Sequence, residues 1–338
     1  MTDQKINLVD ATLRDGSHAL RHGFTVEMVT PIAKGLEESG VSIIELSHGD
    51  GLGGSSYTYG FSKVDQFELL AAANAQIKRA KLGVLLLPGI GTTEDLKKAH
   101  SCGARVVRVA THITEADISE EHIKAARQLD MMPVGFLMMA HMASKERIAE
   151  EAKKMESYGA AYINLADSAG YLFPDAVKER IEAVINAVNI PVGFHAHNNL
   201  GMALANSLAA VETGATYIDG TLRGLGAGAG NAQLEVFAGL LQRSGYETGT
   251  DFYRLMDVAQ EAVEPIMLRP QVIDNGSMML GYTGVYSSFL LHVYNAAEKF
   301  ALDPRDILVE LGKRKMVGGQ EDMIIDIAYQ LKHHLVTT

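Results

Sequence analysis

Cysteine is nearly absent from this sequence: Cys102 is the only one among 338 residues, so no internal disulfide can form, which fits a reducing compartment. Positive charge is also in deficit, because 30 lysines and arginines face 41 aspartates and glutamates, for a formal net charge of −11. This balance argues against a nucleic-acid partner. No apolar run approaches the roughly 18 residues that span a bilayer, and no signal-peptide pattern opens the chain. We therefore expect a soluble, cytoplasmic protein.

Short β-rich runs of the buried, parallel type recur along the chain, with helix-like stretches between them. A hydrophobic content of 47% is ample for a large core, and 33 glycines indicate many turns. We expect strands near residues 6–12, 43–47, 82–87, 105–111, 133–139, 161–167, 191–197 and 217–222. This alternation predicts an α/β fold, a (β/α)8 TIM barrel. The rival is a doubly wound open sheet, but no dinucleotide fingerprint follows the first strand.

Apolar residues at helical spacing fill the segments between these strands. The expected helices lie at 25–39, 63–79, 93–102, 120–130, 145–158, 174–188 and 200–213. After about residue 263 the alternation stops, and Pro265 and Pro270 interrupt the chain. Further helices are then expected at 285–300, 304–313 and 321–334. We divide the chain into a catalytic barrel, 1–263, and a helical C-terminal region, 264–338, that packs on the barrel.

Polar side chains gather where the expected strands end, and this is the catalytic end of a TIM barrel. His195 and His197 lie two residues apart, so on a strand both imidazoles project to one face. Asp15 follows the first strand and completes a set of two imidazoles and one carboxylate. Such a set suits Mn²⁺, Fe²⁺, Co²⁺ or Zn²⁺ rather than Mg²⁺ or Ca²⁺, and leaves positions for a chelating 2-oxo acid.

Two residues close to Asp15 suggest chemistry on such a substrate. Arg14 could hydrogen-bond the oxygen on which charge develops when a 2-oxo acid becomes an enolate; a barrel-rim ion pair is the alternative. His18 is the candidate base, because imidazole titrates near neutrality. His22 and His48 are weaker competitors for that role, and we expect both to be solvated loop residues.

Glycine-rich stretches at 49–56 and 224–231 follow the second and eighth expected strands. The second lies where TIM barrels often bind phosphate, although close packing of a lid explains such runs equally well. Asn231, at its end, could reach the metal through its side-chain oxygen. No lysine ends an expected strand, which disfavours a Schiff-base aldolase.

Four motifs together resemble the metal-dependent barrel superfamily of pyruvate aldolases, 3-hydroxy-3-methylglutaryl-CoA lyase and isopropylmalate synthase. They lie at 13–16, 167–170, 195–198 and 226–231. Within that superfamily the chain resembles the 4-hydroxy-2-oxovalerate aldolase family over essentially its whole length. The finer match is carried by residues 14–19, 48–56, 224–231 and 281–289.

The resemblance implies Mn²⁺, with other divalent transition metals such as Co²⁺ as alternatives, held by Asp15, His195 and His197. It implies that His18 removes the C4 hydroxyl proton of 4-hydroxy-2-oxopentanoate. The C3–C4 bond then breaks to give acetaldehyde and the pyruvate enolate, which the metal and Arg14 stabilise.

The resemblance also implies substrate contacts and a protein partner. Ser168 would hold the carboxylate end of the substrate and Tyr286 would border the C4 substituent, with Tyr282 as the neighbour most easily confused with it. The implied partner is an acylating acetaldehyde dehydrogenase in a heterotetramer, with the helical tail as docking element and the aldehyde passed directly between the enzymes.

Three other functions stay open at this point. A Claisen-type acyltransferase of the same superfamily would need acetyl-CoA, and His18 with the Tyr286 segment and the short tail oppose it. An Fe²⁺ oxygenase could use the same ligands, but the barrel and the Arg14–Asp15 pair oppose it. The last alternative is a non-catalytic partner subunit that the metal only stabilises.

Overall fold

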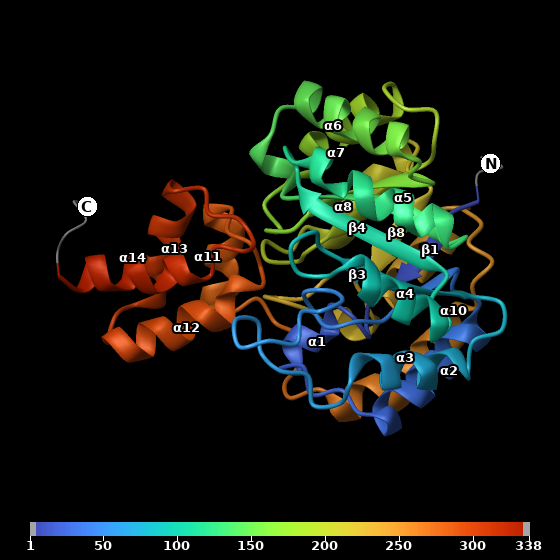
Figure 1. The fold of residues 1–338 in the computed structure, drawn as a ribbon, viewed down its shortest axis with the longest axis horizontal. Coiled ribbons are helices and arrows are strands. Elements are labelled where there is room, and N and C mark those ends of the chain that lie inside the picture. Colours follow the sequence, from blue (N-terminus) through green and yellow to red (C-terminus); the bar gives the residue numbers. More distant parts are fainter. Residues whose placement is uncertain (1–4, 334–338) are drawn as a thin grey trace.

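The structure is a computed structural model and describes residues 5–333. Its eight strands are parallel and pair in sequence order, and β8 pairs with β1 to close a barrel (Figure 1). The strands are β1 (Asn7–Asp10), β2 (Ile43–Glu45), β3 (Lys81–Leu86), β4 (Val106–His112), β5 (Met132–Met138), β6 (Tyr162–Asp167), β7 (Val192–Ala196) and β8 (Tyr217–Gly220). The expected (β/α)8 barrel is confirmed, because an open doubly wound sheet cannot make the β1–β8 pairing.

Helices connect the strands and cover the outside of the barrel (Figure 1). They are α1 (Gly16–Ala19), α2 (Val26–Ser39), α3 (Gln66–Asn74), α4 (Thr93–Ser101), α5 (Glu120–Gln128), α6 (Lys145–Tyr158), α7 (Pro174–Ile185), α8 (Ala203–Thr213), α9 (Leu234–Arg243) and α10 (Phe252–Val258). Short turns of helix are η1 (Ala116–Ser119), η2 (Ala140–Met142), η3 (Leu222–Gly224), η4 (Ala259–Val263) and η5 (Glu264–Ile266). Helix α3 is shorter than the expected 63–79, because the Asp65 side chain accepts from the amides of Phe67 and Glu68 and caps it there.

The barrel interior holds an apolar layer near the strand starts, and polar side chains join it one layer further along. The apolar layer is one cluster of buried side chains: Val9, Ile43, Val106, Val134 and Tyr162. Two residues further along their strands, on the same inward face, stand the fully buried polar side chains of Glu45, Arg108 and Asn164. Polar groups inside a barrel must find hydrogen-bond or ion-pair partners there. These side chains are therefore available to bond to the polar groups at the C-terminal mouth.

Four C-terminal helices form a second body beside the barrel, coloured orange to red in Figure 1. They are α11 (Asn275–Thr283), α12 (Phe289–Phe300), α13 (Pro304–Lys313) and α14 (Asp322–Lys332). Their shared hydrophobic cluster includes Leu280, Phe289 and Ile327. Helix α13 has the expected bounds, whereas α11 was not expected, and residue 334 of the last expected helix lies outside the described residues. Within residues 5–333, no helix is long and apolar enough to cross a membrane.

Candidate active site

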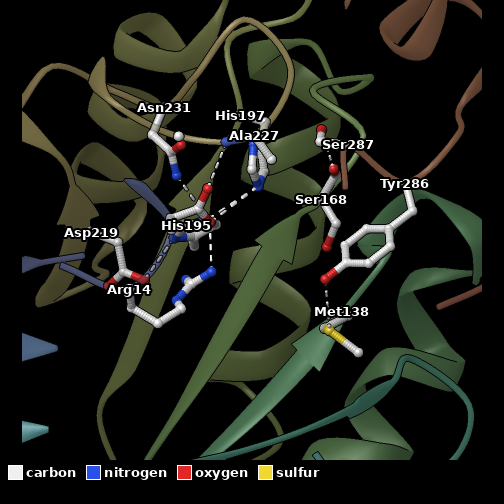
Figure 2. Close-up of polar contacts among 12 residues, drawn as sticks. Arg14, Met138, Ser168, His195, His197, Asp219, Ala227, Asn231, Tyr286 and Ser287 are labelled. Carbon is white, nitrogen blue, oxygen red and sulfur yellow. Dashed lines mark hydrogen bonds and ion pairs between the residues drawn. The ribbon is translucent and has the colours of Figure 1, made fainter. Parts of the chain in front are cut away.

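Three buried side chains with metal-ligating atoms converge at the C-terminal mouth of the barrel, and Figure 2 labels two of them, His195 and His197. Asp15 stands between β1 and α1, His195 lies on β7, and His197 follows that strand. Asp15 Oδ2 is 3.6 Å from His195 Nε2 and 3.7 Å from His197 Nε2, and the two Nε2 atoms are 3.4 Å apart. Strand alternation placed the two histidines on one face, and barrel closure brings Asp15 to them.

The donor atoms of this set face one another in a form that suits a divalent cation. His195 Nδ1 lies 2.9 Å from Asp219 Oδ2, so its proton is held there and the Nε2 lone pair turns toward the centre. Asn231 Nδ2 lies 3.1 Å from the same Nε2, and its Oδ1 is buried without a hydrogen bond to any described residue. Two imidazole nitrogens, a carboxylate and an unpartnered amide oxygen fit a first-row transition ion.

Electrostatics hold Asp15 and His197 in the protonation states that ligate metals. Burial alone would raise the pKa of Asp15, but the Arg14 guanidinium and then the two imidazoles outweigh it and hold that pKa well below its usual range. Burial lowers the pKa of His197 to about 3. Burial also acts to lower the pKa of His195, but its hydrogen bonds with Asp15 and Asp219 raise it overall. Near neutral pH, Asp15 is an anion and His197 a neutral base.

The glycine-rich stretch 224–231 packs its backbone on this set. The Ala227 N–H donates to Asp15 Oδ1 at 2.9 Å. A Cβ on Gly226 would lie 2.0 Å from Asn231 Oδ1 and 2.8 Å from Asp15 Oδ1, so this approach requires glycine. The stretch closes over the carboxylate, which agrees with close packing rather than with a phosphate cradle.

Arg14 is buried between two carboxylates beside the ligand set. Its Nη1 donates to Asp15 Oδ2 at 2.5 Å and its Nε to Glu45 Oε2 at 2.9 Å. Burial would lower the pKa of Arg14, but the charges of Glu45 and Asp15 raise it overall, so the guanidinium is a permanent cation. The ion pair expected as the alternative is present, yet it lies inside the mouth rather than at a solvated rim.

His18 projects from α1 and packs directly on the other glycine-rich stretch. A Cβ on Gly49 would lie 2.6 Å from both Cε1 and Nε2 of its ring. The imidazole lines a cavity of about 20 Å³ beside the ligand set and also an outer cavity of about 500 Å³. His18 therefore separates the ligand set from the larger, outer space.

His22 and His48 were expected to be solvated loop residues, and this expectation is wrong. Both are buried, and their rings stack with centroids 3.8 Å apart. His22 Nδ1 pairs with Ser17 Oγ at 3.1 Å, and His48 Nε2 with the Gly60 carbonyl at 3.1 Å. Burial lowers the pKa of His22 to about 2 and that of His48 to about 4, so both are neutral packing groups. Neither lines the small cavity beside the ligand set.

Ser168 and Tyr286 reach that small cavity from distant parts of the chain. Ser168 follows β6, and its Oγ accepts the Met139 N–H at 3.1 Å, which leaves the hydroxyl proton to donate elsewhere. Tyr286 lies between α11 and α12 and directs its ring toward Met138 (Figure 2). Tyr282 is 72% exposed on α11 and does not line the cavity.

Three buried residues around the site were not singled out from the sequence. Arg108 and Asp219 form an ion pair inside the barrel, and Asn199 Nδ2 donates to Ser287 Oγ at 2.8 Å. The signal for Arg108 was its position in an apolar strand, because a buried charge requires a partner. That signal does not identify Asp219, which is 111 residues away.

Comparison with known protein families identifies the class of protein to which this chain belongs. A family model described as HMGL-like matches residues 5–262, and one described as a DmpG-like communication domain matches residues 271–333. The barrel and its mouth are therefore of the HMGL-like class. A curated "4-hydroxy-2-oxovalerate aldolase" of Moorella thermoacetica is 66% identical over 331 residues, which cover 98% of each chain. One of Carboxydothermus hydrogenoformans is 60% identical over 97% of this chain and 98% of that one. The chain belongs to the 4-hydroxy-2-oxovalerate aldolase family, a family of carbon–carbon lyases.

Likeness to solved structures supports the fold. The carboxyl transferase domain of Rhizobium etli pyruvate carboxylase superposes with a TM-score of 0.85 at 18% identity, covering 99% of this chain. This chain spans 61% of that structure. At such identity the likeness shows a shared barrel and carries no statement about substrate.

Proposed function

We propose that this chain is a class II aldolase that cleaves 4-hydroxy-2-oxopentanoate to pyruvate and acetaldehyde. The convergence of Asp15, His195 and His197 beside the buried Arg14 and the accessible His18 carries this proposal. A 2-oxo acid offers a carboxylate and a carbonyl oxygen on adjacent carbons, which matches a site with open coordination positions. The curated relatives are named for the same compound.

Asp15, His195 and His197 would hold the divalent metal, for which we propose Mn²⁺, with Co²⁺ as an alternative. Two imidazoles and one carboxylate are a donor set for first-row transition ions. When bound, such an ion supplies Lewis-acid chemistry at the oxygens of the 2-oxo acid. Asn231 contacts His195 through its Nδ2, and its buried Oδ1, which bonds to no described residue, would supply a fourth protein contact to the ion once the amide is flipped.

His18 begins the cleavage by taking the proton of the C4 hydroxyl group. The electron pair left on that oxygen forms the C=O bond of acetaldehyde while the C3–C4 bond breaks. The electrons of the broken bond form the C2=C3 bond of the pyruvate enolate, and the negative charge moves to its oxygen. Arg14 is a buried permanent cation and stabilises that oxygen. A proton from water added at C3 completes pyruvate, and His18 returns the proton that it took to the solvent.

Arg14, Asp15, Ser168, His195 and Tyr286 form the proposed substrate-binding set. The Ser168 hydroxyl already accepts a backbone N–H, so its own proton is available to the substrate carboxylate. Tyr286 stands between the small cavity and a neighbouring cavity of about 80 Å³, a space for the C4 substituent.

The helical C-terminal region, 264–338, is the proposed docking element for an acylating acetaldehyde dehydrogenase, in a heterotetramer that channels the aldehyde. The match of residues 271–333 to a communication domain supports this role. So does the outer cavity of about 500 Å³, which begins at His18 and is lined on its far side by Leu291 and Tyr294 of α12. We place this activity in the cytoplasm, in aromatic hydrocarbon catabolism.

The test is pyruvate release from racemic 4-hydroxy-2-oxopentanoate by chelated enzyme before and after Mn²⁺ is added. Asp15→Asn should abolish release, and His18→Ala should reduce it by about 100-fold or more. Matched controls are Asp175→Asn, on the exposed first turn of α7, and His100→Ala, on the outer helix α4, which should retain full activity.

Mn²⁺-dependent release of pyruvate from at most half of the racemate would support a stereoselective lyase. No pyruvate with any metal would refute the proposal. Product formation only with acetyl-CoA would favour the acyltransferase, and oxygen consumption would favour the oxygenase. Chelation that lowers stability, with Arg14→Ala and His18→Ala changing no rate, would indicate a non-catalytic subunit.

A further inference from the structure

Arg108 stands inside the barrel, fully buried on the inward face of β4. Its Nη1 donates to Glu45 Oε2 at 2.9 Å, and its Nη2 donates to Asp219 Oδ2. The guanidinium carbon also lies 4.3 Å from the centre of the Phe136 ring. One guanidinium on β4 thus joins two carboxylates that come from β2 and β8, the two strands that flank β1.

Each of these carboxylates bonds, through the same oxygen, to a group that the proposed reaction uses. Glu45 Oε2 also accepts from Arg14 Nε at 2.9 Å. Asp219 Oδ2 also lies 2.9 Å from His195 Nδ1 (Figure 2). The sequence of contacts therefore runs unbroken from Arg14 through Arg108 to His195.

Arg108 can affect the positions of both Arg14 and His195 for two physical reasons. A planar guanidinium presents two N–H groups in fixed directions, so the two carboxylates are held at a set separation, which a lysine ammonium does not impose. Its charge also balances two fully buried carboxylates, each of which is costly to bury without a cation. The anion of Asp219 in turn fixes the orientation of the His195 ring.

We propose that Arg108 is a positioning residue that sets both halves of the site: His195 for metal binding through Asp219, and Arg14 for enolate stabilisation through Glu45. This inference rests on the proposed function for the roles of His195 and Arg14. Arg108 itself does not line the cavity beside the ligand set, so it acts through its neighbours.

The test uses Arg108→Lys in the full chain and two measurements. Mn²⁺ affinity is measured by equilibrium dialysis without substrate, and enolate formation by exchange of the pyruvate methyl protons with deuterated water at saturating Mn²⁺. We expect Mn²⁺ affinity to fall about 10- to 100-fold, and the exchange rate to fall about 10-fold or more. The matched control is Arg254→Lys, which pairs with Glu38 on the outer helices and should change neither value.

Single variants of the two carboxylates separate the effect on metal binding from the effect on enolate stabilisation. Asp219→Asn should weaken Mn²⁺ affinity as much as Arg108→Lys does and leave exchange at saturating Mn²⁺ near that of the unaltered chain. Glu45→Gln should lower the exchange rate and leave Mn²⁺ affinity nearly unchanged. If Arg108 has only a structural role, Arg108→Lys should lower the unfolding temperature, and the two carboxylate variants should not change Mn²⁺ affinity and exchange rate separately.

If Arg108→Lys does not fold, Asp219→Asn is compared with the charge-balanced double variant Arg108→Met, Asp219→Asn. The double variant should bind Mn²⁺ like Asp219→Asn alone but exchange pyruvate protons more slowly; equal exchange rates would overturn the proposal. Folded Arg108→Lys with unaltered Mn²⁺ affinity and exchange would also overturn it. Failure of the unaltered chain to bind Mn²⁺ or Co²⁺ would instead refute the proposed function.

Discussion

Ser287 Oγ donates a hydrogen bond to the Ser168 carbonyl oxygen at 2.6 Å, across 119 residues of sequence. The Ser287 N–H donates to the same carbonyl at 3.1 Å, and Asn199 Nδ2 donates to both Ser287 Oγ and the Ala169 carbonyl at 2.8 Å. These bonds fix the segment after α11 to the end of β6. Tyr286, next in sequence to Ser287, is held over the site by the same contacts.

Ser287→Ala should therefore affect stability and substrate binding together. The change removes the 2.6 Å bond and leaves a buried Asn199 N–H with one partner fewer, at a cost of about 1–3 kcal/mol. We expect a lower free energy of unfolding in urea and a raised KM for 4-hydroxy-2-oxopentanoate. Ser157→Ala, which removes an exposed intrahelical bond on α6, is the control. An unaltered KM would show that this link does not position Tyr286.

Gly226→Ala should displace the glycine-rich stretch from the ligand set. The new methyl group would lie 2.0 Å from Asn231 Oδ1, so either this amide or the loop must move, and Asp15 loses its fixed geometry. We expect Mn²⁺ affinity, measured by titration calorimetry, to fall about 10-fold or more. Gly239→Ala on α9 is the matched control, because its Cβ would make only ordinary contact with Phe252 at 3.6 Å. Equal affinities for the two variants would contradict the packing argument.

Removing divalent metal should destabilise the chain. A ligand that binds only the folded state stabilises it by about 2.7 kcal/mol at a concentration 100 times its Kd. We expect the unfolding temperature to rise when Mn²⁺ is added to chelated protein, and expect no rise for Asp15→Asn. Asp175→Asn should respond like the unaltered chain, since this residue lies on the exposed start of α7. A Mn²⁺-induced rise in Asp15→Asn would place the ion elsewhere.

Acid should destabilise the fold through buried neutral histidines. The pKa of His22 is lowered by burial from 6.5 to about 2 in the folded chain, so the unfolded chain binds its proton first as pH falls. The stability contribution of His22 is present above pH 6.5 and is lost progressively below it, by up to about 2 kcal/mol at pH 5.

His22→Asn should reduce this acid sensitivity. The backbone at His22 has φ +58°, a left-handed conformation that asparagine adopts more readily than most residues. The variant should lose less free energy of unfolding between pH 7 and pH 5 than the unaltered chain. Parallel stability curves over that interval would contradict the assignment of His22 as a buried neutral group.

Sequence patterns over a few residues correctly predicted features that depend only on neighbouring residues. Alternation along β7 placed His195 and His197 on one face, and the Asp303–Pro304 boundary marked the start of α13. Helix α11 was missed because its sequence contains Gly276 and Gly281, which lower helix propensity. Both glycines pack closely in the fold: a Cβ would meet Tyr294 Oη at 2.1 Å and Leu200 Cγ at 2.6 Å respectively.

The sequence by itself determined the strand–helix order, the shared face of His195 and His197 and the gathering of polar residues at the strand ends, because these follow from backbone periodicity over a few residues. Only the tertiary structure decided which inward charges pair, since Arg108 meets Asp219 across the closed barrel. It also decided that His22 and His48 stack in a buried layer and that Tyr286, not Tyr282, lines the cavity. These outcomes depend on contacts between segments far apart in the chain, which no local pattern encodes.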